Sequence, residues 1–332
     1  VDDGLFLGGG LKYRTHGFKK EPYASEQLLL ANYALKTNSF SAKYKGHFVS
    51  VFAPKWDLGI DGVFYGPRYV LNYFGQGNET PRTASIAYHR VRMRQFQLDL
   101  SAIHTINRVV SAGVGPLFES TVVLPDQGNI VTTPEVPADV TNRKNFTGLF
   151  TYINMDGRDN QLYPRRGAVF RNELRYVQEV QSGNKGFVNF NSDFRFYISP
   201  LRYDPLTVAV RLGGAANFGD YYFYHSNFLG GDENLRGHRQ ERYAGKTLLY
   251  GNLDLRIRVA EFSNYVFAGD AGLIGFADAG RVWTPTENSK VWHFGFGPGA
   301  YAYLYRVLLV SGHLGFNEYG SKYFRVDFGF FF

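Results

Sequence analysis

The sequence predicts an all-β fold, an antiparallel transmembrane β-barrel of about 16 strands, and three observations support this prediction. The 332 residues include 30 Phe and 24 Tyr but only 2 Met, and aromatic side chains favour the pleated surface of a strand. Apolar and polar residues alternate with a period of two, most clearly in the second half of the chain. No apolar run approaches the roughly 18 residues of a membrane helix, and a mean hydropathy of −0.26 fits strands with one apolar and one polar face.

The alternation gives each expected strand an apolar face and a charged face. In 248–259 the apolar face carries Leu, Ile and Val, and the other face carries Asn252, Asp254, Arg256 and Arg258. A soluble sandwich alternates too, but its polar face tends toward Lys, Thr and Ser. Rows of Arg, Asp, Glu and Asn with mixed sign are instead able to pair across a closed lumen. We therefore expect Asp254, Arg256 and Arg258 to line the lumen of a barrel.

Runs of alternating residues bounded by turn residues define the expected strands in order. They lie at 3–14, 25–36, 39–51, 55–65, 106–118, 143–155, 166–178, 186–199, 206–217, 246–260, 270–283, 290–304, 306–317 and 321–332. The less regular stretch 67–104 is counted as two further strands, which gives about 16 strands with the ~10-residue length that a tilted membrane strand needs. Within this stretch the apolar face changes parity between Met93 and Phe96, so a bulge or a turn is expected there.

The connections between these strands are unequal in length. Those at 66–85, 119–142 and 218–247 are long, whereas those at 202–205 and 305–306 are short. Outer-membrane barrels have long extracellular loops and short periplasmic turns. Counting back from a periplasmic C-terminus therefore places 119–142 and 218–247 outside the cell. We expect residues 1–332 to form one outer-membrane barrel domain, the C-terminal part of a longer chain.

The last expected strand ends the sequence with a row of apolar residues on one face: Phe324, Val326, Phe328, Phe330 and Phe332. A soluble protein seldom ends on such a stripe, because an exposed aromatic edge promotes aggregation. We expect an outer-membrane closure strand that includes Phe328, Phe330 and Phe332. The alternative is a buried C-terminal strand of a soluble barrel. Aromatic residues of the apolar faces are expected to point outward, among them Phe190, Phe194, Phe328 and Phe330.

The first expected strand is rich in glycine, with glycine at positions 4, 8, 9 and 10. Glycine weakens strand pairing because it loses more backbone entropy than other residues and offers no side chain for packing. The seam between the first and last strands is therefore expected to be the labile edge of the barrel. Such a seam is able to open laterally, toward lipid or toward a nascent strand.

Several kinds of chemistry are absent from the sequence. The chain has no cysteine, which excludes disulfide scaffolds, thiolate zinc sites and cysteine nucleophiles. It also lacks a G-x-S-x-G elbow, an H-E-x-x-H pair, a P-loop and paired histidines with metal spacing. We expect no catalytic residue, metal or cofactor in this chain, and His225 and His238 are interpreted as solvated loop residues. The glycines of 295–299 are interpreted as sites for a bend or for close loop packing rather than as a phosphate loop.

A formal net charge of +7 raises the question of nucleic acid binding. The basic residues are dispersed among acidic ones, and no compact basic patch with interleaved aromatics stands out. We therefore expect no nucleic-acid partner. The anionic partners expected instead are outer-membrane lipid headgroups and the phosphates of lipopolysaccharide.

Four segments carry a more specific signal: NYFGQGNET (72–80), DNQLYPRRG (159–167), FLGGDENLRGHRQERYAGKTLLYGNLDLRI (228–257) and IGFADAGRVW (274–283). Together with the terminal aromatic strand they resemble the barrel domain of the bacterial surface antigen superfamily. That superfamily includes the outer-membrane insertase, the two-partner secretion transporters, and barrels fused to periplasmic patatin-like or calcineurin-like phosphoesterase domains. The segments 72–80 and 3–18 (DGLFLGGGLKYRTHGF) resemble the phosphoesterase-fused branch most closely. The resemblance spans nearly the whole chain.

The resemblance implies that the loop 218–247, which bears an Arg-Gly motif, folds into the lumen. Carried over by position, Arg236 and Gly237 form the motif and Arg236 pairs with Asp278, with Phe276 beside it. His238 stands where the family usually has Phe or Tyr, which leaves the stacking part of this contact in question. The alternation independently places Phe276 and Asp278 on one face, and an acidic residue facing lipid at the midplane is unfavourable, so Asp278 is expected to face the lumen. The alternative is that a solvated extracellular loop carries Arg236, Arg239, Glu241 and Arg242.

The resemblance also implies a function, which is insertion or translocation of polypeptides at the bacterial outer membrane. Its partners would be unfolded outer-membrane polypeptides and accessory periplasmic or lipoprotein subunits. Two other functions fit the same barrel. One is a membrane anchor for a periplasmic phosphoesterase or lipase-like domain, with catalysis in residues that precede Val1. The other is a passive diffusion channel.

Overall fold

The computed structural model describes residues 6–18, 20–35, 38–81, 85–126, 128–133, 136–181, 185–201, 203–263 and 268–332. Gly4, part of the glycine-rich start of the first expected strand, lies outside these ranges. All structural statements below concern the described part of the chain.

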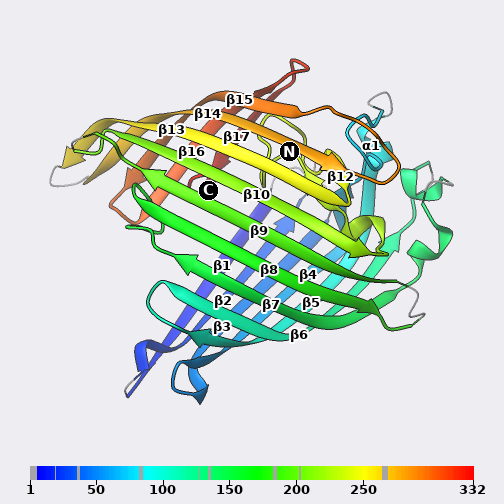
Figure 1. The fold of residues 1–332 in the computed structure, drawn as a ribbon, viewed down its shortest axis with the longest axis horizontal. Coiled ribbons are helices and arrows are strands. Elements are labelled where there is room, and N and C mark those ends of the chain that lie inside the picture. The colour runs from blue at the N-terminus through cyan, green and yellow to red at the C-terminus, as the bar shows by residue number, and fades with distance from the viewer. Residues whose placement is uncertain are drawn as a thin grey trace.

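Fifteen strands form one antiparallel sheet in which each strand is bonded to its neighbours in sequence order (Figure 1). They are β1 (Phe6–Gly17), β2 (Lys20–Ala34), β3 (Ser39–Ala53), β4 (Trp56–Asn72), β5 (Arg90–Thr105), β6 (Val110–Leu124), β7 (Lys144–Asp156), β8 (Gly167–Glu179), β9 (Gly186–Ile198), β10 (Leu206–Gly219), β13 (Thr247–Ser263), β14 (Ala268–Trp283), β15 (His293–Leu304), β16 (Leu308–Asn317) and β17 (Lys322–Asp327). The all-β, antiparallel prediction is confirmed.

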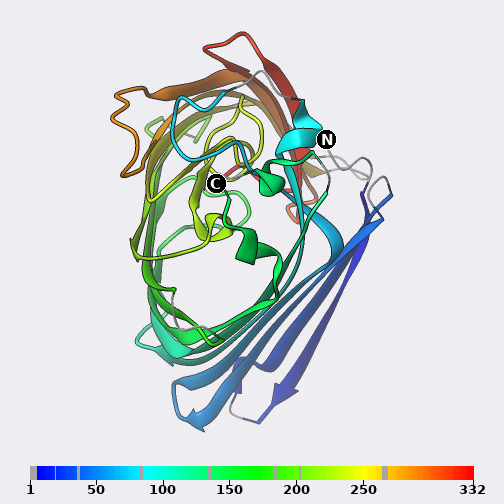
Figure 2. The same cartoon turned by 90° about the vertical axis from the view of Figure 1, so that its right-hand side faces the viewer.

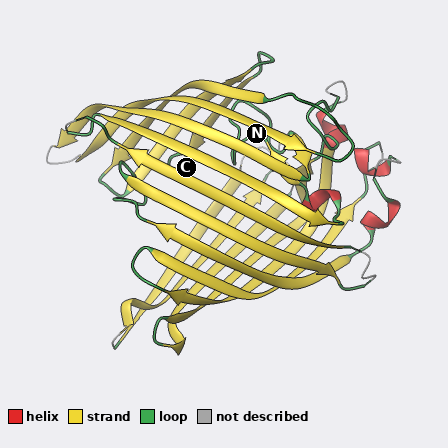
Figure 3. Ribbon diagram, in the orientation of Figure 1, coloured by secondary structure: helices red, strands yellow, loops and turns green. Residues whose placement is uncertain are grey.

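The sheet curls into a wide ring, and the connection between β10 and β13 lies inside it (Figure 2). Within this connection β11 (Asn227–Leu229) and β12 (Tyr243–Gly245) form a separate two-stranded ribbon. The helical turns are α1 (Ile86–His89), η1 (Ile130–Thr132), η2 (Ala138–Thr141) and η3 (Phe223–His225). They gather at the end of the ring where the long loops lie (Figure 3). No helix among the described residues is long and apolar enough to cross a membrane.

The stretch 67–104 contains one strand fewer than the sequence predicted. Its first residues extend β4, the helix α1 follows, and β5 then runs without interruption from Arg90 to Thr105. An irregularity does occur opposite Met93 and Gln95, as predicted, but its extra residues lie in β4 between Tyr65 and Tyr69, and β5 itself has no turn there. Parity changes because Val91 and Met93 pack under the loops inside the ring, whereas Phe96 faces outward. The apolar residues at the two ends of β5 therefore belong to opposite faces.

The predicted faces of the strands are confirmed elsewhere. On β9, Phe190, Phe194, Phe196 and Ile198 are exposed on the outer face, whereas Tyr197 is fully buried. On β13, Leu249, Leu253, Leu255 and Ile257 are outward, and Asn252, Asp254 and Arg256 are buried inside. The inner face carries ion pairs, between adjacent strands for Arg211 with Asp193 and between β8 and β5 for Arg175 with Asp99. A barrel whose outer wall is apolar and whose lumen is lined by paired charges is the arrangement that a membrane imposes.

The C-terminal segment differs from its prediction. The last strand ends at Asp327, and Gly329 has a φ of +131°, which turns the chain away from the sheet. Phe328 is 85% exposed, but Phe330 packs on luminal tyrosines and Phe332 is buried against Tyr197. The prediction that Phe330 faces outward is therefore wrong, and Phe328, Phe330 and Phe332 all lie beyond the last strand rather than in it. A glycine backbone, which the alternation of side chains does not report, redirects Phe330 and Phe332 into the lumen.

The two edges of the sheet are β1 and β17, and no hydrogen bond pairs them within the described residues. The outer side of β1 exposes Leu7, Leu11 and Tyr13, and β17 exposes Phe324 and Val326. The edge backbones of both strands thus keep unpaired hydrogen-bonding groups.

Candidate functional site

The connection between β10 and β13 is shaped by glycines and one asparagine. Gly230 and Gly231 both have positive φ, at +129° and +73°, which most residues avoid. Asn234 closes the turn, because its Oδ1 accepts from the Gly230 N–H at 2.9 Å and its Nδ2 donates to the Phe228 carbonyl at 2.9 Å. Asn252 of β13 in turn donates to the Asn234 carbonyl at 2.9 Å. These bonds fix the loop against the wall and aim residue 236 at β14.

Arg236 is 3% exposed and bound to Asp278 of β14 by three hydrogen bonds. Its backbone N–H and its Nε both donate to Asp278 Oδ2, at 3.0 and 2.8 Å, and its Nη2 donates to Oδ1 at 2.6 Å. This is the bidentate geometry that favours arginine over lysine at a buried carboxylate. The structure therefore brings together the two residues that the sequence motif paired.

A second carboxylate and a second arginine extend this contact into a network. Arg236 Nη2 lies 2.8 Å from Asp254 Oδ1 on the neighbouring strand β13. Asp254 Oδ2 accepts from Arg256 Nη2 at 3.0 Å, and Arg256 Nη2 also donates to the Phe332 carbonyl at 2.9 Å. Two buried positive and two buried negative charges thus balance one another, which is the condition for burying them without a large desolvation penalty.

Two aromatic rings lie close to the Arg236 guanidinium. Its Cζ lies 3.9 Å from the centroid of Phe276 and 4.3 Å from that of Phe331. Arg256 is stacked in the same way, 3.8 Å from the Phe330 centroid. Cation–π contacts of this kind strengthen when the cation is desolvated. The tail that turns in from β17 therefore helps to enclose both arginines.

The tip of the loop lies directly on the backbone of β15 and β16. Gly237 has a φ of +81°, and a Cβ placed there would lie 2.3 Å from the Phe316 carbonyl oxygen. A Cβ on Gly295 would lie 1.7 Å from the Arg236 carbonyl oxygen. Asn317 holds the tip by donating from Nδ2 to the Gly237 carbonyl at 2.8 Å. Gly295 thus allows close loop packing, one of the two roles that the sequence suggested for the glycines of 295–299, whereas Gly297 and Gly299 lie against the backbone of β16.

His238 is buried, so the interpretation of this residue as a solvated loop residue is wrong. Its Nε2 lies 2.9 Å from the Phe294 carbonyl and 3.2 Å from Glu318 Oε2, and its ring contacts Tyr243. Burial opposes ionisation of Glu318, but hydrogen bonds from His238 and His293 hold the pKa of this carboxyl at about 2. His225 is partly buried, with its Nε2 2.9 Å from Glu119 Oε1. Both histidines contact carboxylates of the barrel, which local sequence does not reveal.

The remaining predicted residues separate into those that join the Arg236 network and those that do not. Asp254 and Arg256 join it, whereas Arg258 lies at the short-turn end and contacts Glu261 and Asp270. The solvated-loop alternative does not hold for Arg236 or Arg242, because both side chains are buried. The sequence did not identify four residues that contact the loop or Arg236: Gly295, Asn317, Glu318 and Phe331. Of these, only Gly295 was indicated by a local signal, the glycine pattern of 295–299.

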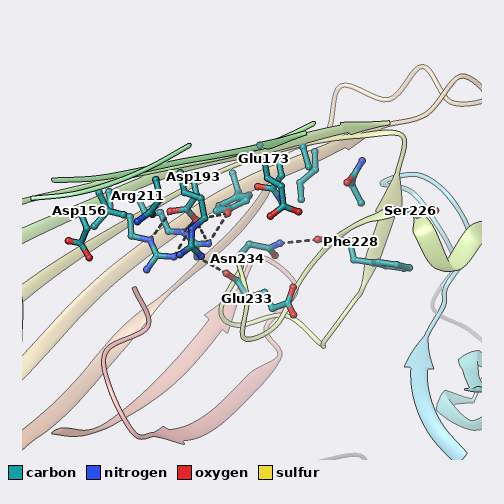
Figure 4. A pocket seen from close by; sticks show the side chains of 18 of the residues that line it. Asp156, Glu173, Asp193, Arg211, Ser226, Phe228, Glu233 and Asn234 are labelled. Carbon is teal, nitrogen blue, oxygen red and sulfur yellow. Dashed lines mark hydrogen bonds and ion pairs between the residues drawn. The ribbon is translucent and has the colours of Figure 1, made fainter. Parts of the chain in front are cut away.

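A polar cavity of about 520 Å³ separates the loop from the wall formed by β7 to β10 and β13. Asp193 and Arg211 extend from the wall toward Glu233 and Asn234 of the loop (Figure 4). Arg211 ties the two sides together, since its Nη1 donates to the Glu233 carbonyl at 2.7 Å. Acidic and basic side chains are interspersed along the wall of this cavity. Within the described residues, no group of three or more His, Cys, Asp or Glu side chains is arranged to hold a metal ion.

Known proteins resemble this chain in sequence family and in fold. The model of the Omp85 superfamily domain matches residues 3–299. Comparison with curated proteins finds no match. BamA from Haemophilus ducreyi lacking POTRA domains 1-3 aligns with a TM-score of 0.63 and 13% identity, over 97% of this chain and 68% of that chain.

Two further solved structures share the fold. CdiB from Acinetobacter baumannii aligns with a TM-score of 0.54 and 12% identity, over 98% of this chain and 66% of that chain. CdiB from Escherichia coli aligns with a TM-score of 0.52 and 12% identity, over 97% of this chain and 62% of that chain. The present chain thus spans about two thirds of the length of these structures. The family match, the antiparallel barrel and its apolar outer wall together show that the chain belongs to the Omp85 superfamily, as a barrel of the Gram-negative outer membrane.

Proposed function

We propose that this barrel inserts or translocates polypeptides at the outer membrane, and that client segments engage it at the seam between β1 and β17. The observation that carries the proposal is the pair of unpaired sheet edges within the described residues. An unpaired edge is a template for an added strand, because its N–H and C=O groups are free to bond an extended peptide.

The glycines of β1 support this role for the seam. Gly8, Gly9 and Gly10 lie in β1, and a Cβ placed on Gly9 would meet open space. Such a strand has little side-chain packing to lose when its partner is exchanged. Exchange of a neighbour along β1 is therefore less unfavourable than it would be along a strand such as β13, whose two neighbours are bonded along its length.

We assign the connection between β10 and β13 the role of a lock on the lumen, held by Arg236 and Asp278. The buried network, the two covering rings and the glycine contacts all favour a docked loop. A docked loop excludes a wide aqueous route and favours use of the seam. The lumen charges would keep the loop in register, since a shift would leave Asp278 buried without its arginine and Asp254 with Arg256 alone.

A cleavable crosslink tests the seam. The chain has no native cysteine, so cysteine at Gly9 combined with cysteine at single positions of β17 can be joined by a short disulfide-forming reagent in the full-length protein. We expect the crosslinked protein to lose insertion of a model outer-membrane polypeptide into vesicles, and reductant to restore it. Single-cysteine variants serve as controls. Full activity of the crosslinked form would refute the proposal.

A passive diffusion channel is the second candidate, favoured by the polar cavity beside the loop. A channel predicts a steady conductance in planar bilayers, and removal of the Arg236 contacts should change it little. The lock instead predicts a low conductance that rises when these contacts are removed. If the barrel instead anchors a periplasmic phosphoesterase or lipase-like domain, crosslinking the seam should leave the enzymatic activity of that domain intact.

A further inference from the structure

The outer wall carries a groove that the function proposed above does not use. It lies across β3 to β7 at the end that bears the long loops, and its volume is about 530 Å³. Four aromatic residues and two arginines define it, and the name aromatic groove is used below for this set: Phe40, Phe64, Phe96, Phe118, Arg94 and Arg143.

The four phenylalanines form a continuous apolar floor across neighbouring strands. Phe64 of β4 is paired with Phe96 of β5, the Phe40 and Phe64 rings lie 5.3 Å apart, and the Phe96 and Phe118 rings lie 6.3 Å apart. Phe40, Phe96 and Phe118 are each exposed on the outer face. A row of exposed rings on the wall of a membrane barrel faces hydrocarbon chains.

The two arginines lie one step closer to the extracellular loops than this floor. Arg94 is paired with Val122 of β6, and Thr121 is paired with Lys144, so Arg143 is the neighbour of Val122 on the other side. Two strand spacings separate the arginines, or about 10 Å between their backbones. They stand side by side on the outer surface.

Neither arginine has an anionic partner in the part of the chain that the structure describes, and both are exposed. Arginines of the lumen differ, since Arg175 and Arg211 are each bound to a carboxylate. The residues that line the groove include no acid. An arginine on the lipid-facing side is tolerated near the interface but not at the midplane, where it costs about 2–4 kcal/mol. Two unpaired cations at the interface therefore need anions from the membrane.

We propose that the aromatic groove binds lipid A, the membrane anchor of lipopolysaccharide. Its phosphates bind Arg94 and Arg143, and its acyl chains lie on the four phenylalanines. Arginine suits phosphate because the guanidinium fork bonds two oxygens at once. The position at the extracellular end selects the outer leaflet, where lipopolysaccharide resides. The proposal does not depend on polypeptide insertion, so its failure and that of the proposed function are separable.

Retention of purified bisphosphorylated lipid A by the full-length protein tests this site. The protein is refolded in detergent, loaded with lipid A, washed, and analysed for bound lipid by mass spectrometry. We expect Arg94→Ala and Arg143→Ala each to weaken retention about tenfold, as loss of a charge-assisted hydrogen bond predicts, and the double variant about a hundredfold. Arg108→Ala is the matched control, because Arg108 is an exposed arginine in the turn at the opposite end of β5 and β6.

Three outcomes would overturn the proposal. In the first, the double variant retains as much lipid A as the parent protein. In the second, Arg108→Ala weakens retention as strongly, which would indicate a non-specific charge effect. In the third, phosphatidylglycerol vesicles compete as well as lipid A, which would make a phospholipid the occupant. Folding of each variant is monitored by the heat-dependent mobility of the barrel on gels, and Phe96→Ala provides a second variant that alters the apolar floor without removing charge.

Discussion

Replacement of Arg236 by alanine is the sharpest perturbation of the lumen network. The change removes a bidentate contact to Asp278, the contact to Asp254 at 2.8 Å, and the stacking between Phe276 and Phe331. Both carboxylates stay buried, with Arg256 as the only cation left in the network described above. Breaking one side of a buried ion pair costs about 3–5 kcal/mol, because the other side is left without compensation.

This free energy translates into a large change in loop opening. Since about 1.4 kcal/mol corresponds to a factor of ten, Arg236→Ala should raise the population of the undocked loop by about two to three and a half orders of magnitude. Arg236→Lys should give an undocked population between those of the parent protein and Arg236→Ala, because lysine keeps the charge but loses the planar fork. The double variant Arg236→Ala/Asp278→Ala should be less destabilised than the sum of the single changes, since it removes the orphaned carboxylate as well.

Two measurements report on the docked loop. Hydrogen exchange followed by mass spectrometry measures protection of 227–245, and planar bilayers measure conductance through the lumen. We expect faster exchange and larger, more frequent openings in Arg236→Ala. Glu233→Gln, an exposed position of the same loop, is the control and should leave both unchanged. Unaltered protection and conductance in a folded Arg236→Ala barrel would refute the lock.

Three further predictions follow from the same contacts. Glu318 has a folded pKa of about 2, below its ordinary value of 4.5, so its contribution to docking is complete above pH 4.5 and is lost as the pH falls through about 2. Loop protection measured across this window should fall in the parent protein, and Glu318→Gln should remove the pH-dependent part; an unchanged titration in that variant would contradict the assignment. Gly295→Ala should displace the loop tip, because the added Cβ would lie 1.7 Å from a carbonyl oxygen, whereas Gly275→Ala on the open outer face should be tolerated. A difference in thermal unfolding of about 1–3 kcal/mol between these two variants is expected from such overpacking, and equal stability would show that the tip does not rest on β15. Arg256→Ala should release the C-terminal segment 328–332, detected as faster hydrogen exchange there, and full protection would show that its other contacts suffice.

Local patterns predicted the wall of this barrel well, because each strand reports its own two faces. A residue two positions along a strand returns to the same side, so Leu249 and Leu253 of β13 are identified as outward without knowledge of any neighbour. The pattern was misleading at 91–96 for a physical reason. The inner face of a barrel is polar only where water or charges fill it, and beneath the extracellular loops it becomes apolar.

The family motif predicted the pairing of Arg236 with Asp278, but not what surrounds it. The rings of Phe331 and Phe276 come from segments far apart in sequence, and only the turn at Gly329 brings Phe331 to the guanidinium. Asn317, at the end of β16, and Glu318, in the connection to β17, likewise reach the loop. No period or motif links such positions, because their proximity depends on the curvature of the whole sheet.

The sequence by itself determined the fold class, the apolar outer wall and the charged inner rows, because these depend on strand period and on the free-energy difference between lipid and water. The arginine that anchors the loop was indicated by the resemblance of its motif to a known family. The tertiary structure alone decided the strand count across 67–104, the inward path of Phe330 and Phe332, the burial of His238, and the two arginines beside the aromatic groove. These depend on backbone angles at a few glycines and on the register between strands, which place residues distant in the chain in contact.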